Sequence, residues 1–111
     1  DYVIPQFAKP YRKEEELIGE VMYIDDFGNV VTNISSEDLE RLETSIGDLI
    51  HLRVGRKTFN TKFCSAYGEV PAGTPLTIIG SHNFLEISVN QGNASKTLDL
   101  KIGDSIRISI R

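Results

Sequence analysis

Residues 49–63 read LIHLRVGRKTFNTKF, and apolar side chains alternate with polar ones along most of this stretch. In its first half, three aliphatic side chains alternate with His51 and Arg53, a period of two that is typical of a strand with one buried face. A Gly-Arg pair then interrupts the alternation, as expected for a tight turn. The stretch predicts a β-hairpin in which residues 49–54 pair with residues 57–63.

Further short runs of apolar and β-branched residues predict strands at 17–24, 30–34, 76–79, 84–89 and 104–110. Residues 35–42 predict the one helix, because serine begins it, acids fill its first turn, and Leu39 and Leu42 share a face. Gly19 is a candidate for a β-bulge. Short strands separated by turns indicate a sandwich or a closed barrel, and closure is favoured because it removes exposed sheet edges.

The composition is that of a globular domain. The chain has 111 residues, of which 40% are hydrophobic and 25% charged, enough for one domain. Its net charge of −4 argues against a nucleic-acid partner, which requires a basic face. No apolar run approaches the ~18 residues of a membrane span and no signal peptide is recognisable, so we expect no membrane partner. The single cysteine, Cys64, suits a reducing, cytoplasmic location.

The first residues differ from the rest of the chain. Residues 1–16 contain two prolines, no hydrophobic period and a final run of charges. Proline fixes φ and lacks a backbone donor, so we expect residues 1–16 to be the tail of an interdomain linker and residues 17–111 to be the barrel domain. The chain opens on Asp1 and its first methionine is Met22, so we expect an N-terminal domain before the linker.

Two polar stretches, residues 23–33 and 80–94, interrupt the strands. The first reads YIDDFGNVVTN and joins two strand-like runs, and side chains on such turns are held by the scaffold while still reaching solvent. The carboxylates of Asp25 and Asp26 suit a metal or a cationic ligand group, or they cap backbone amides of the turn. Asn29 is either a ligand contact or a turn residue with a positive φ.

No stretch carries a self-sufficient catalytic or metal constellation. His82 has no second histidine or cysteine near it in the sequence, whereas zinc needs a cluster of ligands. His51 alternates with core-facing residues and is expected to face solvent. Adjacent side chains diverge, so Ser81 and His82 are not expected to form a catalytic pair. We therefore predict no metal and no cofactor, and we expect Cys64 to be buried or half-buried.

Several short motifs occur in a fixed order along the chain: GEV at 19–21, IDDFGN at 24–29, TNI at 32–34, YGEVPAG at 67–73, GS at 80–81, LEI at 85–87, VNQGNA at 89–94 and LKIGD at 100–104. In this order and spacing they resemble the C-terminal domain of the S-adenosyl-L-methionine (SAM) hydroxide adenosyltransferases. That family includes the SAM-dependent chlorinases and fluorinases. The resemblance covers nearly the whole chain.

The resemblance implies an enzyme with an N-terminal α/β domain, a linker and a C-terminal Greek-key β-barrel. It also implies a homotrimer, in which each active site lies between one subunit's N-terminal domain and its neighbour's barrel. The N-terminal domain supplies the residues that activate water. We therefore expect no catalytic residue in this chain, and we expect the isolated 111 residues to be inactive. Pattern and resemblance together predict an all-β fold, a small closed or nearly closed Greek-key barrel of about seven mostly antiparallel strands with one short helix.

The resemblance also assigns residues to the adenine. Asn29 is expected to hydrogen-bond the adenine edge, and Phe27 and Tyr67 are expected to lie near the ring. The backbone at Val89 and Gln91 is expected to read the amino edge of the base. These roles agree with physical chemistry, since a purine needs an aromatic face together with amide donors and acceptors.

The amino-acid end of SAM is assigned to three residues. Asp25 is expected to hold the ammonium, and Ser81 is expected to meet the carboxylate, with His82 beside it. The halogenating members have an arginine at the position of His82. Arginine grips a carboxylate with a permanently charged fork, whereas histidine is mostly neutral at pH 7, so this departure favours the hydroxide-using branch.

The sequence thus predicts the substrate-binding domain of an enzyme that hydrolyses SAM to adenosine and L-methionine by hydroxide attack at C5′. Two alternatives remain open. One is the C-terminal domain of a SAM-dependent chlorinase or fluorinase, whose halide pocket lies in the N-terminal domain. The other is a non-catalytic ligand-binding barrel such as an oligonucleotide-binding module, which predicts a basic groove with exposed aromatics.

Overall fold

The computed structural model describes residues 11–13 and 16–110. Its strands are β1 (Tyr11–Lys13), β2 (Glu16–Ile24), β3 (Val30–Ser35), β4 (Leu49–Val54), β5 (Lys57–Cys64), β6 (Pro75–Ile79), β7 (Phe84–Val89) and β8 (Ser105–Ser109). Its helices are α1 (Ser36–Arg41), α2 (Ala94–Leu98) and the 3₁₀ helix η2 (Tyr67–Glu69). Within these residues no helix combines the length and the apolar character needed to cross a membrane.

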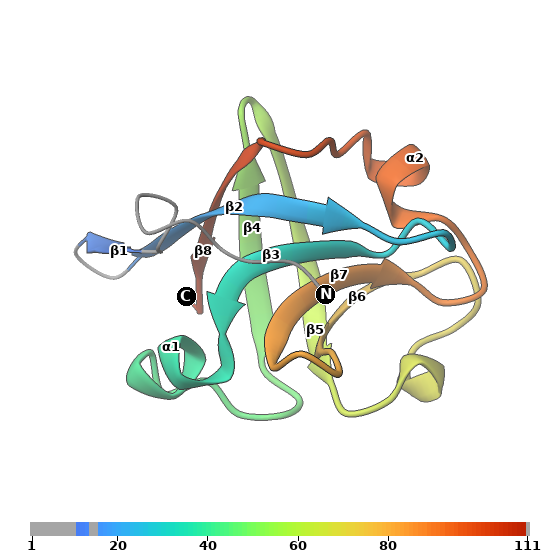
Figure 1. The fold of residues 1–111 in the computed structure, drawn as a ribbon. Helices are drawn as coiled ribbons and strands as arrows, with labels where there is room; N and C mark the ends of the chain where they lie inside the picture. The colour runs from blue at the N-terminus through green and yellow to red at the C-terminus, as the bar shows by residue number, and fades with distance from the viewer. Residues whose placement is uncertain (1–10, 14–15, 111) are drawn as a thin grey trace.

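The strands form a closed barrel (Figure 1). Hydrogen-bonded neighbours follow the order β1-β2-β3-β7-β6-β5-β4-β8, and an additional pairing of β2 with β8 closes the ring. The long strand β2 makes this possible, because its first half pairs with both β1 and β8 while its second half pairs with β3. The predicted all-β, closed barrel is therefore confirmed.

Most neighbouring strands in the described ring are antiparallel, as predicted. Among these described strands, the one parallel pair determines the course of a long loop. Strands β5 and β6 are parallel, with Lys62 opposite Leu76 and Cys64 opposite Ile78. Parallel neighbours require a crossover connection, and residues 65–74, with η2, provide it. Strands β3 and β4 are consecutive in the chain but lie apart in the ring, as a Greek-key connection requires.

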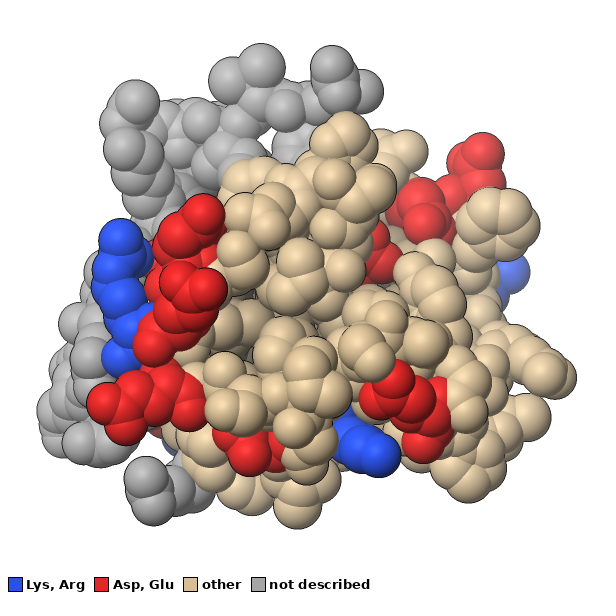
Figure 2. Space-filling model, turned by 90° about the horizontal axis from the view of Figure 1, so that it is seen from below, with Lys and Arg blue, Asp and Glu red and all other residues tan. Residues whose placement is uncertain are grey.

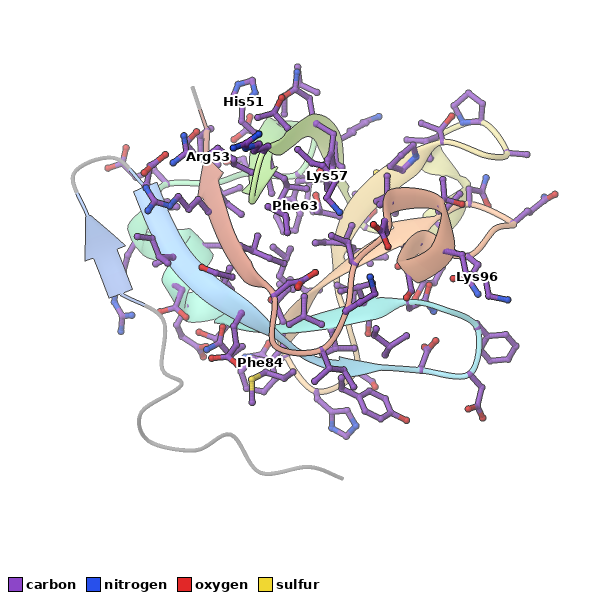
Figure 3. The ribbon with its side chains drawn as sticks, turned by 90° about the horizontal axis from the view of Figure 1, so that it is seen from above. His51, Arg53, Lys57, Phe63, Phe84 and Lys96 are labelled. Atoms are coloured by element: carbon purple, nitrogen blue, oxygen red, sulfur yellow. The ribbon has the colours of Figure 1, made fainter. Side chains whose placement is uncertain are left out.

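Alternating side chains fill the barrel. In β4, Ile50, Leu52 and Val54 are buried, as the hairpin pattern predicted. Phe63 points into the ring of strands, whereas His51 and Arg53 lie outside it (Figure 3). The main core cluster consists of Leu17, Val21, Val30, Ile34, Leu39, Ile50, Leu52, Val54, Phe63, Leu85, Ile87, Val89, Ala94, Leu100, Ile106 and Ile108.

A second, smaller core lies beneath the crossover loop. It contains Cys64, Val70, Leu76 and Ile78, on the face of β5 and β6 that points away from the barrel interior. Cys64 is buried, as expected, and its burial raises the pKa of the thiol, as does the nearby Glu69. The crossover loop is therefore packed onto the barrel by its own apolar contacts rather than held only at its ends.

Two sequence-based expectations about elements were wrong. The bulge in β2 does not lie at Gly19, because the register with β3 shifts between Val21 and Tyr23. Gly19 instead allows a close approach, since a Cβ there would lie 2.5 Å from Asn33 Oδ1 and 2.7 Å from Ile34 Cγ1. One helix was expected, but α2 forms as well, because Asn93 caps it by accepting a hydrogen bond from the Lys96 amide.

The strand β1 lies within the segment expected to be a linker. Tyr11–Lys13 pairs antiparallel with the start of β2. The remaining linker positions, residues 1–10 and 14–15, lie outside the described residues. The division of the chain into linker and barrel at residue 16 stays a prediction.

Candidate functional site

An open groove of about 930 Å³ lies on the outside of the barrel. It is lined by Asp25, Phe27, Asn29, Tyr67, Gly80, Ser81, Glu86, Val89, Asn90, Gln91, Gly92 and Asn93. These residues come from the β2–β3 hairpin, the β5–β6 crossover, the β6–β7 turn, β7 and the loop that follows it. The turn precedes β7 and the loop follows it, so the groove extends along the outward face of β7.

A smaller hollow of about 310 Å³ adjoins the groove and is lined by Tyr23, Asp25, Val31, Ser81, His82, Phe84 and Glu86. Three residues, Asp25, Ser81 and Glu86, line both spaces. The two hollows therefore share a boundary made of two carboxylates and a hydroxyl.

The structure brings the predicted site residues together. Every one of them except His82 lines the larger groove, and His82 lines the smaller hollow beside Ser81. Residues far apart in the sequence, such as Asn29, Tyr67 and Gln91, thus face a common space. Their individual contacts with a ligand remain predictions.

Asp25 organises the hairpin turn that enters the groove. Its Oδ1 accepts hydrogen bonds from the Phe27 and Asn29 amides, each at 2.9 Å, and its Oδ2 accepts one from Asn29 Nδ2 at 2.9 Å. The expectation that a carboxylate caps turn amides is thus confirmed for Asp25, while Asp26 is exposed and lines neither hollow. A carboxylate held by three donors has a fixed orientation, which suits recognition of a cation.

Gly28 joins this turn to the loop after β7. Its φ is +84°, and a Cβ there would lie 2.1 Å from the side chain of Asn93. The Gly28 carbonyl accepts a hydrogen bond from the Ser95 amide at 3.0 Å. Because Asn93 also caps α2, the N-terminus of α2 holds the two groove-lining loops in one arrangement.

Aromatic side chains border the groove at two places. Phe27 on the hairpin is 76% exposed and Tyr67 on η2 is 42% exposed. Their rings are available to pack against a flat ligand.

Tyr67 is anchored by a carboxylate on the floor of the groove. Its hydroxyl donates to Glu86 Oε1 at 3.2 Å. Burial and the neighbouring Glu86 raise the pKa of Tyr67, so the hydroxyl keeps its proton. Burial also raises the pKa of Glu86; Asp25 adds to this rise, whereas the Tyr67 hydrogen bond and His82 oppose it.

The turn that carries Ser81 and His82 is supported by α1. Gly80 N donates to Phe84 O at 2.9 Å and closes the turn, and Asn83 adopts a positive φ of 71°. The Ser36 amide at the start of α1 donates to Asn83 O at 3.1 Å. This contact ties the β6–β7 turn, which lines the smaller hollow, to α1 in the connection between β3 and β4.

Sequence reasoning missed Glu86 and Asn93 as site residues. Glu86 lies between buried Leu85 and Ile87, so alternation predicts only an ordinary solvent-facing position of a strand. The crossover loop, which passes over this face, makes it part of a groove. Asn93 carried a usable signal, since an asparagine followed by Ala-Ser-Lys is a candidate helix N-cap.

The site has no obvious metal or nucleic-acid chemistry among the described residues. Within residues 11–13 and 16–110, no group of three or more His, Cys, Asp and Glu side chains is placed to hold a metal ion. No described Lys or Arg lines either hollow. On the face drawn in Figure 2, acidic side chains cover more of the surface than basic ones, unlike the basic groove of an oligonucleotide-binding barrel.

Comparison with known proteins identifies the relatives of this chain. A curated (R)-S-adenosyl-L-methionine hydrolase from Thermus thermophilus is 34% identical over 81% of this chain and 31% of that protein. A fluorinase from Nocardia brasiliensis is 27% identical over 87% of this chain and 33% of that protein. The chain thus spans about a third of the length of these relatives.

A solved structure confirms the fold. The crystal structure of an uncharacterized conserved protein from Thermotoga maritima has a TM-score of 0.89 and 41% identity, covering 98% of this chain and 41% of that one. The profile of the SAM hydroxide adenosyltransferase C-terminal domain matches residues 19–107, which include both groove-lining loops and all of β7. This chain belongs to the SAM hydroxide adenosyltransferase C-terminal domain family.

Proposed function

We propose that this barrel is the substrate-binding C-terminal domain of an enzyme that hydrolyses SAM to adenosine and L-methionine. The observation that carries the proposal is the shared boundary of the two hollows, where Asp25 and Ser81 meet beside exposed aromatics. Such a site offers a carboxylate for an ammonium, a hydroxyl for a carboxylate and rings for a purine. The name of the (R)-S-adenosyl-L-methionine hydrolase among the curated relatives supports the same substrate.

In this proposal the larger groove receives the nucleoside. Asn29 Nδ2 donates one of its two N–H groups to Asp25 Oδ2, which orients the side-chain amide and leaves its oxygen able to face a base. An acceptor at this position suits the amino group of adenine. Phe27 and Tyr67 supply ring surface, and the loop backbone at Val89 and Gln91 supplies amide and carbonyl groups.

The smaller hollow receives the amino-acid end. Asp25 has two carboxylate oxygens with about four acceptor positions, of which three are occupied by turn donors. The remaining capacity suits one ammonium N–H. Ser81 and His82 lie on the same hollow and face the carboxylate of the methionyl group.

The reaction is displacement at carbon. A water-derived hydroxide attacks the ribose C5′, the C5′–S bond breaks, and the sulfur leaves as the neutral thioether of methionine. Nucleophile and leaving group must lie in line, so fixing both ends of the substrate is the contribution of this domain. The residues that activate the water come from an N-terminal domain, the active sites form between subunits of a trimer, and the isolated 111 residues are inactive.

Incubating the full-length protein that contains this barrel with SAM tests the proposal. We expect adenosine and L-methionine in equal amounts by liquid chromatography, with label from isotopically labelled water in the 5′-hydroxyl of adenosine. The absence of both products would reject the proposed function.

The fluorinase among the relatives supports a second candidate, in which chloride or fluoride replaces hydroxide. The same assay, run with each halide added, distinguishes the two. A 5′-halogenated nucleoside in place of adenosine would establish the halogenase and leave the substrate-binding role of the barrel unchanged.

A further inference from the structure

None of the roles predicted for the site involves Glu86, although this residue lies at its centre. It lies in the middle of β7 and lines both hollows. Its Oε1 accepts the Tyr67 hydroxyl at 3.2 Å. The rest of the carboxyl group lies against Gly80, where an added Cβ would come within 1.9 Å of Oε2. The side chain is thus held between the crossover loop and the β6–β7 turn.

No described lysine or arginine lines either hollow to balance the charge of this carboxylate, and among the groups that shift its pKa only His82 opposes that charge. Asp25 is near enough to raise the pKa of Glu86 in addition to the larger effect of burial. Two carboxylates facing one space destabilise each other unless a cation lies between them.

The geometry of an amino acid places its ammonium at this boundary. The α-ammonium and the α-carboxylate are bonded to the same carbon, so the groups that hold them must be close together. Asp25, Ser81 and Glu86 are the three residues common to both hollows. An ammonium has three N–H donors, and Asp25, with three donors already bound to it, satisfies only part of that capacity.

We propose that Glu86 is a second carboxylate acceptor for the methionyl ammonium, opposite Asp25, and that this pair makes the site selective for ligands with a free amino group. The proposal rests on the proposed function for the identity of the ligand. Tyr67 takes part as a positioning residue, because its hydroxyl donates to Oε1 of Glu86 and so fixes the orientation of the carboxylate.

The test compares full-length wild type with Glu86→Gln, which keeps the size of the side chain and an acceptor for Tyr67 but removes the charge. Calorimetry measures three ligands: L-methionine, its analogue 4-(methylthio)butanoic acid, which lacks the amino group, and adenosine. We expect the variant to bind L-methionine at least about tenfold more weakly, because a charge-assisted hydrogen bond is lost. We expect its affinities for the analogue and for adenosine to stay within about twofold of wild type.

Two further variants separate charge from structure. Glu40→Gln removes the same charge from an exposed position on α1 and is expected to leave all three affinities unchanged. Tyr67→Phe removes the hydroxyl but keeps the Glu86 charge, so its loss of methionine affinity is expected to be smaller than that of Glu86→Gln. A Tyr67→Phe loss that equals or exceeds the Glu86→Gln loss would overturn the ammonium contact, because Glu86 would then act only through the loop.

The outcomes distinguish this inference from the proposed function. If wild type hydrolyses SAM while Glu86→Gln binds L-methionine as tightly as wild type, the inference is overturned and the function stands. Equal losses for L-methionine and for the analogue without an amino group also overturn it, since the defect is then structural. If wild type hydrolyses no SAM but L-methionine affinity falls more in Glu86→Gln than in Tyr67→Phe and stays unchanged in Glu40→Gln, the ammonium site stands without the function. Wild type that binds no L-methionine rejects the inference directly.

Discussion

At the scale of single residues, Gly28 shows how one position can determine a site without contacting a ligand through a side chain. Its φ of +84° is a conformation that residues with a Cβ rarely adopt, and the space that a Cβ would need is filled by Asn93. Both constraints serve the same end, which is to bring the Asp25 turn against the loop after β7. The sequence suggested a positive φ at Asn29, whereas the structure has it at Gly28; the packing partner of Gly28 could not be predicted either, because Asn93 is distant in the chain.

Replacing Gly28 with alanine tests the two constraints separately when Gly47 is used as the control. Gly47 has a φ of +98°, and a Cβ added there would meet nothing within 4 Å. Gly47→Ala is therefore expected to lower the free energy of unfolding only by the cost of the left-handed backbone conformation, about 1–2 kcal/mol. Gly28→Ala adds overlap with Asn93 and is expected to lose about 2–5 kcal/mol in the free energy of unfolding. Urea denaturation measures the free energy of unfolding of both variants. Equal decreases would show that the Asn93 side chain moves out of the way of the added Cβ without loss of stability.

At the scale of elements, the sequence predicted those strands whose buried and exposed side chains alternate. Residues 49–54 and 84–89 were predicted with the bounds of β4 and β7. The three-residue β1 and the five-residue α2 were not, because neither is long enough to show a period. Glu86 was missed for a related reason: strand alternation predicts which side chains point outward but not which of them another loop covers.

Helix α1 was predicted from its cap, and the cap is testable. Ser35 Oγ accepts from the Asp38 amide at 3.2 Å, while Asp38 Oδ2 accepts from the Ser35 amide at 2.9 Å. We expect Ser35→Ala to lower the free energy of unfolding by about 1 kcal/mol, because a helix amide loses its acceptor. Ser105→Ala, at an exposed position in β8, is expected to change it by less than about 0.5 kcal/mol. Thermal unfolding of both variants measures the difference, and similar values would contradict the importance of the cap.

At the scale of the whole molecule, the groove results from closure of the barrel rather than from any one segment. Its walls come from the β2–β3 hairpin and the β5–β6 crossover, which flank β7 only because the ring order is β3-β7-β6-β5. The sequence predicted closure from the cost of free edges, but not this order or the parallel β5–β6 pair. Strand order depends on long-range pairings such as Leu17 with Ile108, which leave no local pattern.

The crossover loop half-buries Glu86, and this gives a prediction about stability and pH. Burial raises the pKa of Glu86 above its ordinary value of 4.5, so the folded protein binds this proton more tightly than the unfolded chain does. The stability contributed by Glu86 is therefore complete below about pH 4.5 and is lost as pH rises through the raised pKa. Hydrogen bonds lower the pKa values of three other carboxyl groups, those of Glu37, Glu69 and Asp99. The stability that these groups contribute is lost as pH falls, but this loss is the same in wild type and in a Glu86 variant.

We therefore expect Glu86→Gln to become more stable relative to wild type as pH rises from about 4 to about 8. Urea unfolding of both proteins at each pH measures the difference, and a difference independent of pH would contradict the burial of an ionisable group at this position. At neutral pH, saturating L-methionine should then reduce or reverse the excess stability of Glu86→Gln over wild type. A ligand stabilises the folded state more when it binds more tightly, and wild type keeps the carboxylate that faces the ammonium. A residue that lowers stability in the empty groove and raises it in the occupied one is a residue whose charge is retained for binding.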